Sequence, residues 1–376
     1  MKIAFFVSPL DTIPVSSEHI LAPWYLAETI VPKLVARGHQ VTTYCAEGSH
    51  VPGAMVTAGV TACVSQIDTM EPREFASKNA RGELQLASRL FQDARDSRFD
   101  VIHVFQGAQH VLPFVPFVTT PVLCTFHDPF TQSMSALSLA YGQQKNLFFT
   151  ALSLSHSKGV SGGMPPPYVV YNGMPIQEYP FSPLPGTYVM TCGRIVPQKG
   201  HDDAIAAVGT DENLVIAGKY YKNDPNMYAY WLVKILPAID GKRIRYIPFT
   251  RNDSYKQLLA GAKALLFPIR WDEPFGLVMV EAMACGTPVI AYNRGSVSEI
   301  VKDGVTGFIV EPDLGNLGNL GNVTIKKPGI AGLVEAIHRI GEIDRAACRR
   351  HVEEHFTVEK MVEGYEQVYK KILGGV

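Results

Sequence analysis

The stretch FPIRWDEPFGLVMVEAMACGTPVIAY, residues 267–292, decides the fold of the chain. KALLFPI, which leads into it, is an apolar run of strand length, and VMVEAMAC is apolar nearly all round and stops at Gly286, as a buried helix does. TPVIAY is then the next strand. The pattern predicts a strand–helix–strand unit with parallel strands, and such units bind ligands at the carboxyl ends of the strands.

Two carboxylates interrupt this apolar pattern, Glu273 in the loop and Glu281 inside the helix. A buried ionised carboxylate is costly unless hydrogen-bond donors satisfy it, and no Lys or Arg lies within one helical turn of Glu281. We therefore expect a ligand rich in hydroxyl groups to supply the donors. The loop also ends at a helix amino terminus, whose free N–H groups can receive a phosphate or sugar oxygen. The junction residues are Pro274, Phe275, Gly276 and Leu277.

The segment EPFGLVMVEAMACGTPVIAYNRGSVSEIVKDGVTGFIV resembles, without a break, one segment of a known enzyme family. Glu273 and Glu281 frame the E-x7-E motif of the retaining GT-B glycosyltransferases of the large family-four (glycosyl transferases group 1) type, and the chain resembles their avilamycin-type branch. The resemblance implies an α/β fold of two Rossmann-like domains, with parallel sheets facing a cleft. A generic nucleotide-site unit with one solvated Glu is the alternative interpretation.

The composition favours a two-domain protein of the cytoplasm. The 376 residues are 47% hydrophobic, which is more than one core usually contains. The net charge is −1 and the basic residues are scattered, so no nucleic-acid partner is expected. Six widely spaced cysteines without C-x-x-C spacing predict free thiols in a reducing compartment. No stretch approaches transmembrane length, although peripheral membrane contact stays compatible with the sequence.

The first part of the chain, residues 1–178, alternates strands and helices like a Rossmann-like domain. Strands are expected at 1–9, 41–46, 99–107, 121–130 and 148–158, and helices at 24–40 and 71–97. The resembled family carries a Gly-Gly pair in the first loop, where this chain has Ser16 and Ser17 before Glu18. Serine resists positive φ, so we expect the loop to follow a different path or to donate through its hydroxyls.

His127 and Asp128 follow a buried strand, at the end where site residues of α/β sheets gather. A lone histidine there is more often structural. The resembled family places a His-Asp or His-Gly pair at this point, lining the sugar pocket opposite the glutamates, which implies a site role for His127 and a weaker one for Asp128. Trp24 and Phe130 are candidates for stacking on a sugar, although core packing explains them more simply.

Residues 175–186 contain four prolines and are interpreted as the linker between two domains. The alternation of strands and helices then restarts, and residues 184–356 are expected to form the nucleotide-sugar donor domain. The last helix, in residues 357–376, is amphipathic. The resemblance implies that this helix packs back on the first domain.

The loop GRIVPQKG places Arg194 and Lys199 between a strand end and a helix start. Two cations beside a helix amino terminus can cradle an anion, although lone basic residues in loops are usually solvated. The resembled family holds the donor diphosphate with an Arg and a Lys at this spacing. Further donor-binding residues are expected at the ends of the neighbouring strands, namely Gly193, Gly218, Lys219 and Ile247. Ile247 belongs to a stretch that lines the base pocket in relatives.

The resemblance assigns roles in sugar transfer from a UDP- or GDP-sugar to an acceptor hydroxyl, with retention of anomeric configuration. Arg194 and Lys199 stabilise the departing diphosphate without a metal, since no DxD-type cluster follows a strand. Glu281 accepts hydrogen bonds from the ribose diol, Glu273 from donor-sugar hydroxyls, and His127 lines the sugar pocket. The leaving phosphate assists removal of the acceptor proton. No cofactor is expected, and the acceptor, whether a glycan, a lipid-linked sugar or a small molecule, is not specified.

Two rival interpretations use the same residues differently, and one further motif lies near the carboxyl terminus. A GT-B-like epimerase or glycan phosphorylase would share the two-domain architecture. A sugar-nucleotide-binding protein without turnover would explain the altered Ser16-Ser17 loop. His351, Glu354 and His355 fit an inverted zinc-peptidase pattern, but a zinc site needs a third ligand and few residues follow, so we expect a solvated helix face there.

Overall fold

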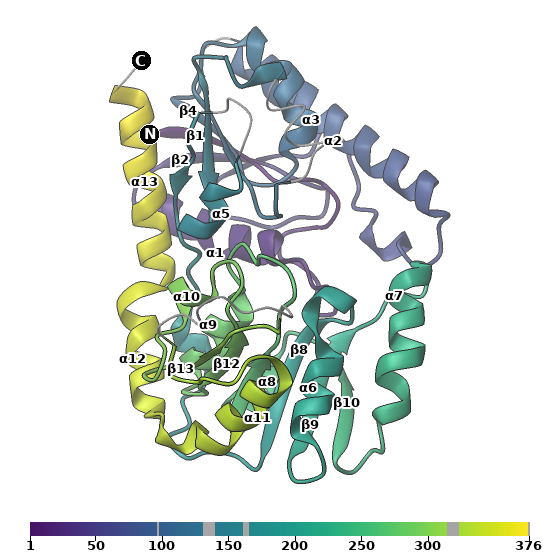
Figure 1. The fold of residues 1–376 in the computed structure, drawn as a ribbon. Coiled ribbons are helices and arrows are strands. Elements are labelled where there is room, and N and C mark those ends of the chain that lie inside the picture. The colour runs from purple at the N-terminus through teal and green to yellow at the C-terminus, as the bar shows by residue number, and fades with distance from the viewer. Residues whose placement is uncertain (96–97, 131–139, 161–164, 314–322, 375–376) are drawn as a thin grey trace. The chain divides into compact units, whose positions relative to one another are not determined.

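A computed structural model describes residues 1–95, 98–130, 140–160, 165–313 and 323–374 (Figure 1). The chain divides into two compact units. Unit 1 contains residues 1–16, 21–173 and 358–376, and unit 2 contains residues 17–20 and 174–357. Unit 2 thus begins at Met174 and includes the proline-rich residues 175–186.

The sheet of unit 1 is parallel throughout its described strands, in the order β3-β2-β1-β4-β5-β6-β7. The strands are β1 (Lys2–Phe6), β2 (Gln40–Tyr44), β3 (Ala54–Val56), β4 (Val101–Val104), β5 (Val122–Thr125), β6 (Leu147–Ala151) and β7 (Tyr168–Val169). The order reverses between β1 and β4, which makes their carboxyl ends the switch point of the sheet. Continuous apolar strands such as β4 and β5 are fully buried, because parallel sheets are covered on both faces.

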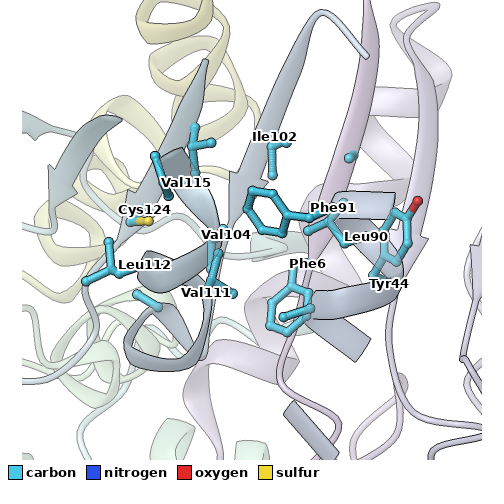
Figure 2. Close-up of a cluster of buried hydrophobic side chains, with 14 of the residues drawn as sticks. Phe6, Tyr44, Leu90, Phe91, Ile102, Val104, Val111, Leu112, Val115 and Cys124 are labelled. Carbon is cyan, nitrogen blue, oxygen red and sulfur yellow. The ribbon is translucent and has the colours of Figure 1, made fainter. Parts of the chain in front are cut away.

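Helices of unit 1 bury their apolar faces against this sheet. They are α1 (Ala22–Ala36), α2 (Pro72–Ala94), α3 (Ala108–Val111), α5 (Leu154–Lys158) and α13 (Val358–Gly374), with 3-10 turns at Val64–Gln66 and Leu112–Phe117. Figure 2 shows Leu90 and Phe91 of α2 packed against side chains of the strands, among them Ile102 and Val104. The strand expected at 148–158 is wrong in its second half, because the Ser153 side chain accepts from the His156 N–H and starts α5.

The carboxyl-terminal helix α13 is part of unit 1 and packs against α1. Its buried Tyr369 hydroxyl lies 2.6 Å from Nδ1 of His103 on β4. On the surface, Lys33 of α1 and Glu359 of α13 form an ion pair of 2.6 Å. Burial lowers the pKa of His103 to about 3, so this core histidine is neutral.

The sheet of unit 2 is also parallel, in the order β10-β9-β8-β11-β12-β13. The strands are β8 (Tyr188–Arg194), β9 (Asn213–Lys219), β10 (Ile244–Pro248), β11 (Ala264–Phe267), β12 (Val289–Tyr292) and β13 (Gly307–Val310). The switch point lies between β8 and β11. Two α/β units with parallel sheets confirm the predicted fold class.

The helices of unit 2 alternate with these strands. They are α6 (His201–Val208), α7 (Pro225–Tyr230), α8 (Asp253–Ala260), α9 (Leu277–Ala284), α10 (Val297–Ile300), α11 (Gly329–Arg339) and α12 (Arg345–His355). The helix at α7 starts earlier than the apolar run WLVKILPAI suggests, because Asp224 caps the Met227 N–H. It continues as a π-helical turn (Trp231–Ile235) and a 3-10 turn (Leu236–Ala238). Among the described helices, none combines the length and apolarity needed to cross a bilayer.

Candidate active site

The predicted loops meet at the carboxyl ends of β8 and β11, the switch point of unit 2. The backbone N–H of Arg270 donates to the carbonyl of Gln198 at 2.8 Å and joins the two loops. Gly200 has φ +67°, and a Cβ there would collide with the carbonyl oxygen of Pro268. A glycine at this position therefore allows the approach that brings GRIVPQKG and WDEPFG together.

Lys199 and Glu273 form an ion pair across these loops. The distance from Lys199 Nζ to Glu273 Oε2 is 2.7 Å, and both side chains are almost buried, at 13% and 12% exposure. The indole N–H of Trp271 donates to the same oxygen at 2.7 Å, and its ring lies 5.4 Å from the ammonium. The sequence paired Lys199 with Arg194 as an anion cradle, whereas the structure pairs it with a carboxylate.

Two groups of this cluster have no partner among the described residues. They are the guanidinium of Arg194, the last residue of β8, and Oε1 of Glu273. One cation and one carboxylate oxygen are therefore available to a ligand at the carboxyl ends of these strands.

Glu281 on α9 is satisfied by the protein itself. It is only 1% exposed, and its Oε1 accepts from the Tyr179 hydroxyl at 3.2 Å and from the Arg251 guanidinium. Its Oε2 accepts from the Tyr255 hydroxyl at 2.8 Å. Burial raises the pKa of Tyr255 well above its usual value, so this hydroxyl stays protonated and donates.

These contacts correct the expectation that a ligand must supply the donors to Glu281. The partners lie far from it in the sequence, on α8, on the loop before α8 and in the proline-rich segment, so local spacing gave no sign of them. A ribose hydroxyl that donates to Glu281 therefore has to share a carboxylate whose charge Arg251 already neutralises.

The predicted junction residues form the amino terminus of α9. Gly276, the N-cap, has φ +80°, and the first N–H groups of the helix have no intrahelical acceptor. Ser296, at the start of α10, braces the loop, because its N–H donates to the Glu273 carbonyl at 2.9 Å and its hydroxyl donates to the Phe275 carbonyl at 2.8 Å. Phe275 is buried, so Pro274, Phe275, Gly276 and Leu277 can offer mainly backbone groups to a ligand.

The remaining donor-site candidates of unit 2 lie on adjacent strands. Gly193 on β8 is the register partner of Gly218 on β9, and Lys219 follows it beside Arg194. A Cβ on Gly218 would collide with Ile195, so this glycine also serves packing. Ile247 lies on β10, opposite Ala217 of β9.

Residues 17 and 18, which are part of unit 2, contact its other residues through backbone carbonyls. The Ser17 carbonyl accepts from the Arg251 N–H at 2.7 Å, and the Glu18 carbonyl accepts from Lys219 Nζ at 3.4 Å. Arg251 is thereby tied to both Ser17 and Glu281, and sequence reasoning missed it. Its place in YIPFTRN, next to the expected base pocket, is the only signal that the sequence offered.

His127 belongs to unit 1, whereas the other predicted site residues belong to unit 2. It follows β5, and its ring packs edge-on against Phe105 at 4.6 Å. Burial, with a smaller effect of nearby His156, lowers the pKa of His127 to about 3, so its imidazole is neutral. Nε2 of His127 is buried without a hydrogen-bond partner in the part of the chain that the structure describes.

Other candidates from the sequence have structural roles. Trp24 is 2% exposed and donates to the Ser8 carbonyl at 3.0 Å, and Phe130 packs against Phe126 at 4.7 Å, so core contacts account for both rings. Nε2 of His351 lies 3.1 Å from the Ile300 carbonyl and Nδ1 of His355 lies 2.9 Å from the His351 carbonyl. The expected solvated face is wrong for His351, which is half-buried. The described residues contain no group of three or more potential metal ligands.

Two protein-family models match the chain. The model of the glycosyl transferases group 1 matches residues 179–316, and that of glycosyltransferase family 4 matches residues 25–160. Glycogen synthase of Mycobacterium tuberculosis is 26% identical over 366 residues, covering 84% of this chain and 81% of that protein.

Solved structures show the same fold over the whole chain. AviGT4, a glycosyltransferase involved in avilamycin A biosynthesis, superposes with a TM-score of 0.68 at 18% identity, covering 100% of this chain and 99% of its own. Anabaena Alr3699/HepE in complex with UDP and glucose superposes with a TM-score of 0.69 at 20% identity, covering 99% and 100%. The chain thus belongs to the glycosyl transferases group 1 of glycosyltransferase family 4, retaining enzymes of GT-B fold that use nucleotide-sugar donors.

Proposed function

We propose that the chain transfers a sugar from a UDP- or GDP-sugar to an acceptor hydroxyl, without a metal ion. The observation that carries the proposal is the Lys199–Glu273 pair, which lies at the switch point of unit 2, where Arg194 ends β8. A cation, a carboxylate and a helix amino terminus supply the three contacts that a sugar diphosphate needs. Six buried free cysteines support the cytoplasm as the place of reaction.

Charge stabilisation of the leaving diphosphate falls to Arg194, Lys199 and the first N–H groups of α9. Lys199 keeps its ammonium beside Glu273, so the two groups together span the phosphate and the sugar ends of the donor. Oε1 of Glu273 accepts from a sugar hydroxyl near the anomeric carbon. Glu281 accepts from the ribose diol and is held by Tyr179, Arg251 and Tyr255.

We also assign a sugar-binding role to His127, which belongs to unit 1. As a neutral imidazole it serves as a hydrogen-bonding group and not as a general acid. The acceptor oxygen forms its bond to the anomeric carbon as the bond to the diphosphate breaks. The leaving phosphate takes the acceptor proton, directly or through solvent, and the configuration is retained.

The first donor to test is UDP-glucose, since Alr3699/HepE was crystallised with it. Nucleotide release is measured for UDP-, GDP- and ADP-sugars, with and without a panel of glycan, lipid-linked and small-molecule acceptors. We expect release with one nucleotide class, acceleration by one acceptor class, an unchanged anomer by NMR, and no effect of a chelator.

Three outcomes would replace the proposal. Binding without release for every donor would make the chain a sugar-nucleotide-binding protein. Release of an epimerised sugar, or a requirement for inorganic phosphate, would indicate an epimerase or a phosphorylase. Lys199→Ala tests the site and Lys263→Ala is its matched control, because Lys263 also pairs with a glutamate, Glu212, in unit 2 but near the amino ends of the strands.

A further inference from the structure

The helical segment of residues 225–238 presents an apolar face to solvent. It contains α7, the π-helical turn and the 3-10 turn, and runs along β10, at the lower right of Figure 1. Eight of its residues are exposed, and all but Asn226 and Lys234 are apolar. The six apolar ones, here named the apolar stripe, are Pro225, Ala229, Leu232, Val233, Leu236 and Pro237.

Three aliphatic side chains form the centre of the apolar stripe. Leu232 is 42% exposed, Val233 68% and Leu236 44%. Their spacing places them on one side of the helix, whereas the side of a surface helix that faces water is normally polar. Contiguous exposed apolar side chains of this kind mark an interaction surface.

The opposite face of the helix fixes its orientation. Trp231 is 6% exposed and stacks on Tyr220 with 4.5 Å between ring centroids and 10° between planes. It also lies 4.8 Å from the ring of Tyr246 on β10. Because these rings and the buried Ile235 hold the inner face, the apolar stripe cannot turn inward without breaking the packing.

The region around the apolar stripe is strongly basic. Residues 219–245 carry a formal charge of +4, in a chain whose net charge is −1. The charged residues are the basic Lys219, Lys222, Lys234, Lys242, Arg243 and Arg245 and the acidic Asp224 and Asp240. Both aspartates accept backbone N–H groups, from Met227 for Asp224 and from Lys242 and Ile244 for Asp240.

Three of these lysines are free to act together. Lys222, Lys234 and Lys242 are exposed, and none has an ion-pair partner among the residues that the structure describes. An apolar strip bordered by unpaired lysines has the chemistry of a helix that lies in a membrane interface.

We propose that the apolar stripe and these lysines dock the enzyme on a bilayer that contains anionic lipids. The aliphatic side chains enter the boundary between headgroups and acyl chains, while the ammonium groups contact lipid phosphates. A second copy of the chain is the weaker occupant, because a two-fold contact would bring a charge of +4 against another +4. A soluble polyanion would use the lysines but leave the aliphatic side chains in water.

Vesicle co-sedimentation of the full chain tests this surface without requiring any transferase activity. The probes are vesicles of phosphatidylcholine alone and of phosphatidylcholine with an equal part of phosphatidylglycerol, at about 0.1 M salt. We expect binding to the anionic vesicles, weak binding to the neutral ones, and loss of binding at high salt.

Two variants and a matched control separate the contribution of the aliphatic side chains to vesicle binding from that of the lysines. Val233→Asp is expected to weaken anionic-vesicle binding at least about tenfold. The triple variant K222Q/K234Q/K242Q is expected to weaken it roughly a hundredfold, at about fivefold for each lysine. Leu184→Asp should bind like the wild type, because Leu184 is 74% exposed in unit 2 but lies outside the apolar stripe.

Several results would overturn the docking surface. Failure of the wild type to bind anionic vesicles would do so, as would equal binding by Val233→Asp and Leu184→Asp. If light scattering shows a dimer that Val233→Asp converts to a monomer while vesicle binding is unchanged, a second copy covers the stripe instead. Circular dichroism of each variant confirms that folding is intact, which is expected for exposed positions.

Discussion

Replacing Arg251 by methionine removes the only cationic partner that Glu281 has among the described residues. The carboxylate is 1% exposed, and the variant leaves it with two tyrosine hydroxyls, from Tyr179 and Tyr255. Methionine keeps most of the volume of the arginine stem, so the change tests charge rather than packing. A buried carboxylate without its cation is among the costlier defects in a protein interior.

The expected loss of unfolding free energy is about 3–5 kcal/mol, the usual cost of removing one partner of a buried ion pair. Unit 2 spans residues 174–357 together with residues 17–20, and for a domain of this size each kcal/mol lowers Tm by about 2–4 °C. The Tm of unit 2 should therefore fall by roughly 6–20 °C. The double variant R251M/E281Q removes both charges and should recover much of that loss.

Thermal unfolding followed by calorimetry measures the effect, because the two units can melt separately. Arg350→Met is the matched control: Arg350 pairs with Asp344 at 3.1 Å, but both side chains are about 60% exposed, so that pair should contribute less than about 1 kcal/mol. Equal Tm shifts for Arg251→Met and Arg350→Met, or a double variant no more stable than the single one, would refute the account of Glu281.

Three further predictions concern the loops and the core. Lys199→Ala should lower kcat roughly a hundredfold with a smaller change in acceptor KM, in steady-state assays, because its charge acts on the leaving group; an unchanged kcat would contradict that role. Gly200→Ala should lower the free energy of unfolding by about 3 kcal/mol, because alanine resists positive φ and its Cβ would collide with backbone. Gly241→Ala should lower it by only about 1 kcal/mol, because Gly241 has φ +72° but no neighbour within 4 Å of the added Cβ. Unfolding midpoints decide between the two, and equal shifts would remove the collision argument. Stability should also fall on acidification from about pH 6.5 towards pH 4, because unfolded histidines take up protons there while buried ones stay neutral. The slope should approach about 4 kcal/mol per pH unit, and a flat Tm between these pH values would count against it. The buried histidines are His103, His127 and His201. Burial lowers the pKa of His103 and of His127 to about 3, and that of His201 to about 4.

Local pattern predicted much of the candidate site. The apolar run before Pro268, the helix stop at Gly286 and the motif of Glu273 and Glu281 placed a strand–helix–strand unit where β11, α9 and β12 lie. GRIVPQKG was likewise expected between a strand and a helix, and it lies between β8 and α6. Such features are legible because periodicity, caps and turn residues act over a few positions of the chain.

The pairs that the charged side chains form were not predictable in the same way. Lys199 was expected beside Arg194, five residues away, but it contacts Glu273. The chain reaches Glu273 only after α6, β9, α7, β10, α8 and β11. Glu281 was expected to wait for a ligand, but Arg251 and Tyr255 satisfy it. An ion pair of this kind depends on which strands become neighbours, and spacing along the sequence does not carry that information.

Sequence pattern was enough to predict the α/β class, the two parallel sheets and the glycosyltransferase family, because these follow from short-range hydrophobic periodicity and from one long motif. The tertiary structure alone decided which charges meet. The order of strands in unit 2 brings β8 next to β11, and Gly200 lets their loops touch. Only then can Lys199 and Glu273 form their ion pair at the carboxyl ends of these strands. Charge pairing depends on distance in space, whereas sequence pattern reports distance along the chain.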